Sequence, residues 1–250
     1  MLLKGISQYS QYNYCLFDSF REHNCIAAFS CGRIDLGFSN EHNFQVKRKV
    51  YLKKLRINFH DLICLQQVHG NRILLATEKE KGRGALEYNS AIPGYDGLIT
   101  RESFLPLAVF TADCLPIFIL DTKQRLAAIL HAGWRGTKNN ILQAALQILK
   151  HEFSSRAEEI ICGLGPGIRS CCYEVGAEFN NYFSKNLVRR KRRIFLDLAG
   201  ANLKQLIESG IPEENISDSG ICTSCRNKDF FSYRREGLGA GRMMSVIMMK

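Results

Sequence analysis

The residues best suited to chemistry lie near the middle of the chain, beside two apolar runs. Residues 115–120 and 126–130 are apolar and are separated by the polar segment 121–124, which predicts two strands joined by a turn. Cys114 enters the first run and His131 leaves the second. Because the start of one antiparallel strand lies beside the end of the next, the thiol and the imidazole are predicted to meet at one end of a sheet.

A second histidine, His69, has the same kind of placement. It follows the apolar run 62–68 and precedes Gly70, much as His131 is followed by Gly133. Glycines permit tight turns and a close approach of the backbone to a ligand. Two imidazoles and a thiol suit zinc, with a fourth position open for water or substrate. The same Cys–His pair also suits a nucleophile with its base, while a buried structural cysteine beside a core histidine is the inert alternative.

Four other cysteines form two close pairs, Cys171–Cys172 and Cys222–Cys225. The C-x-x-C spacing of the second pair is typical of half a zinc site or of a redox pair. The adjacent pair lacks the usual spacing of a zinc knuckle, so we expect structural thiols with no metal between them. The N-terminal segment has no long apolar run, and we therefore expect a reducing, cytoplasmic compartment in which most of the ten cysteines are free.

Two arginine-containing segments are candidates for an anion site. Residues 165–169 read G-P-G-I-R and resemble a loop whose backbone N–H groups can face a phosphate. Arg234 and Arg235 lie between an aromatic run and a glycine-rich turn, where a guanidinium group could hold phosphate or carboxylate with two hydrogen bonds. The ordinary alternatives are a plain turn for the first segment and a surface ion pair for the second.

The charge of the chain is strongly basic, with 34 basic and 24 acidic residues giving a net charge of +10. Such a balance can attract phosphates or nucleic acid. Five of the basic residues form the run 189–193, which usually marks a solvated face. No RNA-binding aromatic signature or zinc-finger spacing accompanies it, and no apolar run is long enough for a membrane span. We therefore expect neither nucleic acid nor a membrane as a partner.

Alternating strands and helices must position these residues. Further strands are predicted at 26–30, 62–68, 72–76, 105–110, 160–164 and 243–248, and helices at 139–151, 177–183 and 196–208. A helix capped by Asn40 is expected to bury Val46, Val50, Leu52 and Leu55. No repeat or linker divides the sequence, so we expect one domain, residues 1–250, of the α+β or mixed α/β class.

Six motifs together resemble those of the bacterial YfiH/YlmD family, formerly described as a multicopper polyphenol oxidase or laccase-domain family. They are Q-V-H-G at 67–70, Y-D-G-L-I-T at 95–100, T-A-D-C-L-P-I at 111–117, H-A-G-W-R-G at 131–136, C-C-Y-E-V-G at 171–176 and F-F-S-Y-R-R-E-G at 230–237. The resemblance extends over nearly the whole chain from Phe29 onward. The two central motifs are highly specific in combination.

This resemblance implies a four-layer α/β/β/α architecture of the YfiH type. It implies that His69, Cys114 and His131 bind a zinc ion and are the catalytic residues. The implied activity is that of a purine nucleoside phosphorylase, which converts adenosine, inosine or guanosine and phosphate into free base and ribose 1-phosphate. Adenosine deaminase and methylthioadenosine phosphorylase activities would accompany it.

The substrate contacts are expected to come from residues near the same motifs. We expect Arg135, Tyr233 and Arg234 to contact the nucleoside or phosphate, and Trp134, Tyr95 or Tyr233 to stack on the base. A Cys–His hydrolase acting in peptidoglycan editing is the main alternative. A copper-dependent phenol oxidase is less favoured, because copper also accepts thiolate and imidazole ligands but six scattered histidines are few for multicopper chemistry.

Overall fold

The computed structural model describes residues 5–9, 13–38 and 43–250. The strands are β1 (Ile6–Tyr9), β2 (Tyr14–Phe17), β3 (Cys25–Ser30), β4 (Ile63–Gln66), β5 (Ile73–Leu75), β6 (Ile92–Pro93), β7 (Gly97–Thr100), β8 (Leu107–Thr111), β9 (Leu115–Asp121), β10 (Leu126–Ala132), β11 (Ile160–Leu164), β12 (Glu174–Val175), β13 (Leu187–Arg190), β14 (Arg193–Leu196), β15 (Ile216–Asp218) and β16 (Met243–Met249). The α-helices are α1 (Asp18–Arg21), α2 (Phe44–Lys54), α3 (Trp134–Lys138), α4 (Ile141–Phe153), α5 (Asn180–Phe183), α6 (Leu198–Glu208) and α7 (Tyr233–Glu236).

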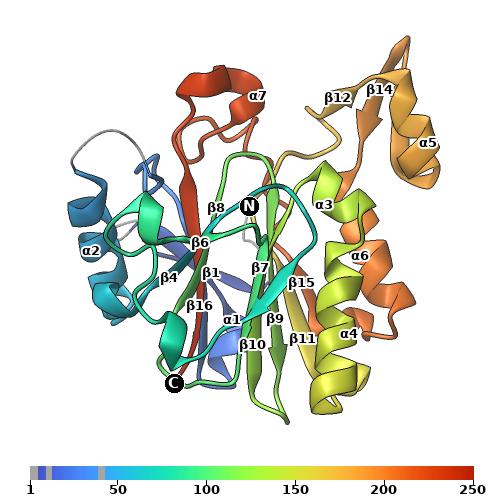
Figure 1. The fold of residues 1–250 in the computed structure, drawn as a ribbon. Coiled ribbons are helices and arrows are strands. Elements are labelled where there is room, and N and C mark those ends of the chain that lie inside the picture. Colours follow the sequence, from blue (N-terminus) through green and yellow to red (C-terminus); the bar gives the residue numbers. More distant parts are fainter. Residues whose placement is uncertain (1–4, 10–12, 39–42) are drawn as a thin grey trace.

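Two large mixed sheets lie face to face, with helices on their outer sides. One sheet has the strand order β1-β2-β3-β16-β8-β4-β6, and the other has the order β15-β11-β9-β10-β7-β5. Helix α2 covers the first sheet, while α4 and α6 cover the second (Figure 1). The predicted four-layer α/β/β/α architecture of mixed α/β class is therefore confirmed. A small third sheet, β12-β14-β13, carries the basic run as an exposed hairpin.

The predicted central hairpin is present as the antiparallel pair β9–β10, in which His131 lies opposite Pro116. Both faces of this hairpin are buried, which explains its continuous apolar runs. Phe118 faces the first sheet and contacts Phe17 across the layer, with ring centroids 5.4 Å apart. Leu115 and its alternate neighbours face α4 and α6 instead. The reactive residues are thus carried by a strand pair that is fixed on both sides.

Most predicted elements are confirmed, with shifted ends. The helix predicted at 139–151 begins at Ile141, and the one predicted at 196–208 begins after Asp197, whose side chain caps it. The segment 177–183 is a 3₁₀ turn followed by the single turn α5. Asn40, the expected cap of α2, lies outside the described residues. Among the described residues, no helix combines the length and the apolar character needed to cross a bilayer.

The buried face of α2 differs from the prediction. Leu52 and Leu55 are buried, but Val46 and Val50 are 58% and 51% exposed. The most deeply buried long side chain on this helix is Arg48, which is 0% exposed. A pattern based on apolar residues alone assigns an arginine to the solvent-facing side. The prediction therefore included Val46 and Val50 and left out Arg48.

Arg48 is buried because its guanidinium group has partners on its edge and on its faces. It donates hydrogen bonds to the carbonyl oxygens of Leu36 at 2.7 Å and Gly84 at 3.0 Å. It also lies over the rings of Phe38 and Phe110, 4.1 and 4.5 Å from their centroids. Burial lowers the pKa of Arg48 to about 10, so it stays charged at neutral pH. This cation joins α2 to the loops that contain Leu36 and Gly84 and to the first sheet.

We predict that Arg48→Met lowers the free energy of unfolding by about 3 kcal/mol or more, because a methionine of similar length leaves buried carbonyl groups without a donor. Val46→Ala on the same helix should change it by no more than about 0.5 kcal/mol, since Val46 is exposed. Urea denaturation of the two variants beside the wild type measures both values. Similar small losses for both would show that Arg48 is not an anchor of α2.

Candidate metal centre and active-site cleft

The two histidines and the cysteine predicted from the sequence do converge. The ligand atoms of His69, Cys114 and His131 all lie within 4.8 Å of one another. His69 follows β4 of the first sheet, Cys114 directly precedes β9, and His131 is the penultimate residue of β10 in the second sheet. The site therefore spans both sheets at one end, the end at which α3 and α7 lie in Figure 1.

The carboxylate of Asp96 orients the two histidines. Its Oδ1 atom lies 2.8 Å from Nδ1 of His131, and both side chains are buried. The backbone N–H groups of His69 and Gly70 also donate to this carboxylate, at 2.9 and 2.7 Å. With Nδ1–H of His131 donated to Asp96, Nε2 is the nitrogen left to bind a ligand, as is usual for metal-binding histidines.

The glycines beside the site are required for close approach. A Cβ atom on Gly133 would lie 2.7 Å from Sγ of Cys114, and one on Gly136 would lie 3.0 Å from the carbonyl oxygen of Gly70. The chain can therefore turn from β10 into α3 against the thiol only because no side chain intervenes. The tight turn is therefore confirmed, whereas a close approach of this backbone to a ligand stays a prediction.

The thiol and the imidazole stabilise each other's charged forms. Burial disfavours ionisation of Cys114, but the positive charge of His131 and hydrogen bonds from His131 and His69 outweigh it and lower the pKa of Cys114 to about 6. Burial likewise disfavours the imidazolium, but the thiolate and Asp96 raise the pKa of His131 to about 9. Near neutral pH, Cys114 is therefore an anionic sulfur, the form that binds a metal or attacks an electrophile.

The donor set fits a zinc ion. A thiolate and two imidazoles are preferred zinc ligands, and three protein ligands are typical of zinc sites that keep one position for chemistry. A metal-binding histidine usually donates its other ring N–H group to a carboxylate or carbonyl, and here that acceptor is Asp96. Cys114 is half-buried and His69 is exposed, so the trio is accessible from solvent on one side.

The trio lies in a cavity of about 1210 Å³ whose lining includes Cys114 and both histidines. Arg135, Tyr233 and Arg234, the predicted substrate contacts, line the same cavity. The guanidinium group of Arg135 lies 4.7 Å from the Trp134 ring centroid. Arg234 donates to the backbone oxygen of Glu174 at 2.8 Å, which holds it at the rim. Their location in one cleft with the trio agrees with the prediction, whereas their role remains a prediction.

Three other candidates are not placed to contact a ligand. Arg235 donates to the backbone oxygens of Ser224 and Phe230, so it supports a loop. In the segment 165–169, Gly167 and Ile168 donate their N–H groups within the protein, and Arg169 pairs with Asp218; of the two alternatives, the segment is therefore a plain turn and not an anion loop. Tyr95 does not line the cavity and lies under Arg72 instead.

Two aspartates with central roles were not identified from the sequence. Asp96 appears in the sequence only as part of the Y-D-G-L-I-T motif, with no role of its own. Asp113, next to Cys114, accepts hydrogen bonds from Thr223 Oγ1 at 2.6 Å, Ser232 Oγ at 3.0 Å and the N–H of Arg234 at 2.7 Å. Its φ of 87° is unusual for a side-chain-bearing residue. That carboxylate fixes the start of α7 beside the site.

Comparisons with known proteins show that most of this chain, residues 29–250, is similar to one protein family. The family model described as multi-copper polyphenol oxidoreductase laccase matches residues 29–250. The chain is 34% identical over 194 residues to purine nucleoside phosphorylase YlmD of Geobacillus stearothermophilus, covering 74% of this chain and 71% of that one. It is 32% identical over 206 residues to adenosine deaminase RL5 from an unknown prokaryotic organism, covering 79% and 78%.

The fold of this chain also matches a solved structure. The crystal structure of YlmD from Geobacillus stearothermophilus matches with a TM-score of 0.90 and 27% sequence identity. The match covers 98% of this chain and 99% of that chain. The fold is therefore shared from end to end.

Replacing Asp96 tests the electrostatics of the trio. In metal-free protein, alkylation of Cys114 should follow a thiolate pKa of about 6. Asp96→Asn removes the charge that raises the pKa of His131, so the imidazolium is lost at lower pH and the pKa of Cys114 should rise. Peptide mapping of Cys114 alkylation across pH measures the shift, with Glu208→Gln, at an exposed position near the end of α6, as a matched charge control. An unchanged profile in Asp96→Asn would contradict this account.

Proposed function

This chain belongs to the YfiH/YlmD family, described as multi-copper polyphenol oxidoreductase laccase, and we propose that it is a zinc-dependent purine nucleoside phosphorylase. Its substrates would be adenosine, inosine, guanosine and methylthioadenosine, each cleaved with phosphate into free base and a sugar 1-phosphate. Deamination of adenosine would be a second activity of the same cleft. The names of two relatives, purine nucleoside phosphorylase and adenosine deaminase, support these two activities.

The observation that carries the proposal is the composition of one cleft. A thiolate and two imidazoles lie together in it, and three arginines and several aromatic rings line it. A phosphorylase must hold a phosphate, a sugar and a flat base at the same time. Guanidinium groups suit the phosphate, and aromatic faces suit the base. The volume of about 1210 Å³ exceeds the size range of about 300–1,000 Å³ typical of small-molecule sites.

Each residue has a role that follows from its position. His69, Cys114 and His131 would hold the zinc ion, which would supply a Lewis acid for a polar group of the substrate. Arg135 and Arg234 would hold phosphate, whose oxygen attacks the anomeric carbon of the sugar as the bond to the base breaks. Asp96 is a positioning residue, because it fixes the tautomer and ring plane of His131.

The aromatic residues of the cleft offer places for the base. Trp134 and Tyr233 line the cavity and are the members of the expected stacking set that remain available. Tyr233 is 49% exposed, so a base could cover its ring and bury apolar surface. Phe38 and Phe110 also line the cavity. All four rings are candidate positions for a purine beside the metal-binding trio.

One further function is favoured by a specific observation. Cys114, His131 and Asp96 have the order nucleophile, base and orienting carboxylate that cysteine hydrolases use. A hydrolase of amide bonds, acting in peptidoglycan editing, is therefore the second candidate. Oxidation of phenols with several coppers has less support, because among the described residues only His69 and His131 are histidines in a group able to hold a metal.

Base release distinguishes these functions. Adenosine plus phosphate should yield adenine and ribose 1-phosphate, and inosine should yield hypoxanthine. Removing zinc with a chelator should abolish release, and adding zinc back should restore it, because the trio needs the metal to act on the substrate. Chromatography of the products, with and without phosphate, measures this. A folded, zinc-loaded protein that releases no base from any of the four nucleosides would favour the hydrolase.

Arg234 provides a test of the phosphate position. Losing a charged hydrogen bond to phosphate costs about 1.5–3 kcal/mol, so Arg234→Ala should raise the KM for phosphate about ten- to a hundredfold. Arg192→Ala, on the exposed turn between β13 and β14, removes the same charge far from any role in the cleft and should leave this KM unchanged. Equal effects of the two variants would indicate only a loss of net positive charge.

A further inference from the structure

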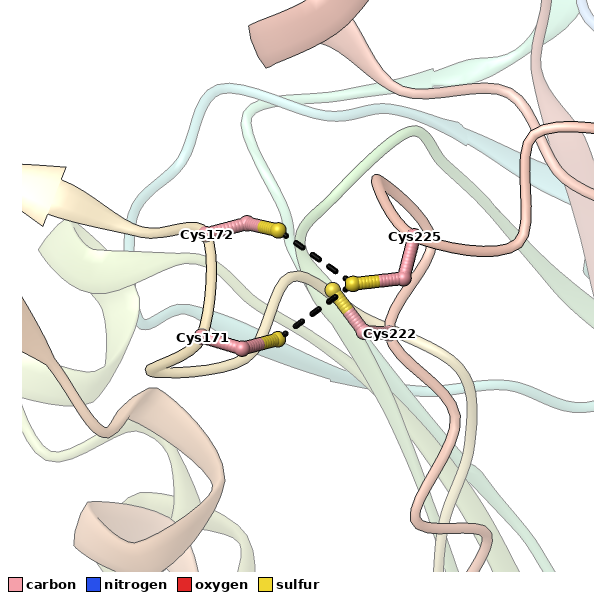
Figure 2. A group of neighbouring side chains, drawn as sticks. All are labelled: Cys171, Cys172, Cys222 and Cys225. Carbon is pink, nitrogen blue, oxygen red and sulfur yellow. Dashed lines mark hydrogen bonds between the residues drawn. The ribbon is translucent and has the colours of Figure 1, made fainter.

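Four cysteines gather in a second cluster, formed by two loops. The Sγ atoms of Cys171, Cys172, Cys222 and Cys225 all lie within 4.8 Å of one another. Figure 2 shows the side chains of the adjacent pair pointing from one loop toward those of the C-x-x-C pair on the other. The spacing argument against a four-cysteine site is therefore wrong, because the fold, and not the sequence spacing, brings the two pairs together.

The separation of the sulfurs suits one tetrahedral metal ion. Sγ of Cys225 lies 3.5 Å from that of Cys171 and 3.3 Å from that of Cys172. Zinc–sulfur bonds of about 2.3 Å in a tetrahedron place ligand sulfurs about 3.8 Å apart. These two distances are within half an ångström of that value, and every other pair of sulfurs in the cluster lies within 4.8 Å. All four are free thiols, and no disulfide links them.

The two loops are built to hold this arrangement. Gly167 and Cys222 form a parallel β-bridge, which sets the loops side by side. Arg169 strengthens this contact, because its guanidinium group binds the carboxylate of Asp218 at 2.7 and 2.8 Å and its Nε donates to the backbone oxygen of Ile221 at 3.2 Å. The cysteines are thus held by backbone and ion-pair contacts beyond their own mutual contacts.

Cys222 also has the environment of a metal-bound thiolate. The backbone of Arg169 and of Cys225 donates hydrogen bonds to its sulfur. A backbone hydrogen bond from the last residue of a C-x-x-C segment to the first sulfur disperses negative charge on that sulfur. Cys222 is buried, whereas Cys171 and Cys225 are exposed, so a metal ion could enter from solvent.

We propose that Cys171, Cys172, Cys222 and Cys225 bind one structural zinc ion as a closed four-thiolate site, separate from the trio of His69, Cys114 and His131. Binding would replace four S–H bonds by four zinc–sulfur bonds and release four protons to solvent. Four protein ligands leave no position for substrate, which is characteristic of structural zinc.

Zinc at this place would brace one wall of the cleft. Tyr173 lines the cavity and directly follows Cys172 in the chain. Thr223 directly follows Cys222, and its hydroxyl donates to Asp113, the neighbour of Cys114. The cluster therefore ties together two loops that each contribute to the cleft. The ion would take no part in the reaction and would act through the position of these residues.

Metal analysis tests the proposal on protein purified under reducing conditions. The wild type should contain two zinc ions per chain. Cys222→Ser with Cys225→Ser, and separately Cys171→Ser with Cys172→Ser, should each lose one. Cys114→Ser, the matched control at the other centre, should keep the zinc of the four-cysteine cluster. After exchange with cobalt, this control should show the visible bands of tetrahedral four-thiolate cobalt, which the paired serine variants should lack.

A second measurement on the wild type remains decisive if the serine variants do not fold. Cys171 and Cys225, although exposed, should resist N-ethylmaleimide in the zinc-loaded protein and react after a strong chelator is added. Rapid reaction of both before chelation would overturn the proposal. So would a disulfide within the cluster, or a wild type with one zinc that is lost on Cys114→Ser. None of these readouts depends on phosphorylase activity. Failure of the proposed function would therefore leave the four-cysteine site untouched, and the reverse also holds.

Discussion

The buried carboxylate of Asp96 is the interaction on which the site depends. It accepts hydrogen bonds from the backbone of Val68, His69 and Gly70, which follow the first sheet, and contacts His131 in the second. A charge with no exposed surface is costly unless it is fully hydrogen-bonded. Here the donors that offset this cost are the segments that carry the two imidazoles. Stabilising the carboxylate and assembling the trio are thus the same physical requirement.

The carboxylate of Asp113, the residue before Cys114, also holds several segments together. Its carboxylate gathers Thr223, Ser232 and the backbone of Arg234, all from the last part of the chain. Two carboxylates near the thiol therefore hold the segments that surround it. This explains how long irregular loops can form a cleft of defined shape. It also explains why Arg234 is found at the rim, since its own N–H is one of the donors to Asp113.

The sequence predicted the parts of this arrangement that depend on local pattern. The hairpin carrying Cys114 and His131 follows from two apolar runs and a polar turn, and the meeting of their side chains follows from antiparallel pairing. Arg48 was missed because a buried cation with aromatic and carbonyl partners has no signature in a pattern of apolar residues. Asp96 was missed because its role depends on three amides of a distant loop. The contact between Cys172 and Cys225 was missed because it depends on a bridge between two loops.

The position of Asp96 at the seam of the two sheets has a consequence for how the molecule folds. Neither sheet by itself contains a complete set of donors for this carboxylate or a complete trio of ligand atoms. A folding intermediate with one sheet formed would expose the aspartate to water and separate His69 from His131. Docking of the two layers, desolvation of the aspartate and creation of the ligand site must therefore occur together. Any ligand held by the trio binds the docked state alone and so shifts the folding equilibrium toward it.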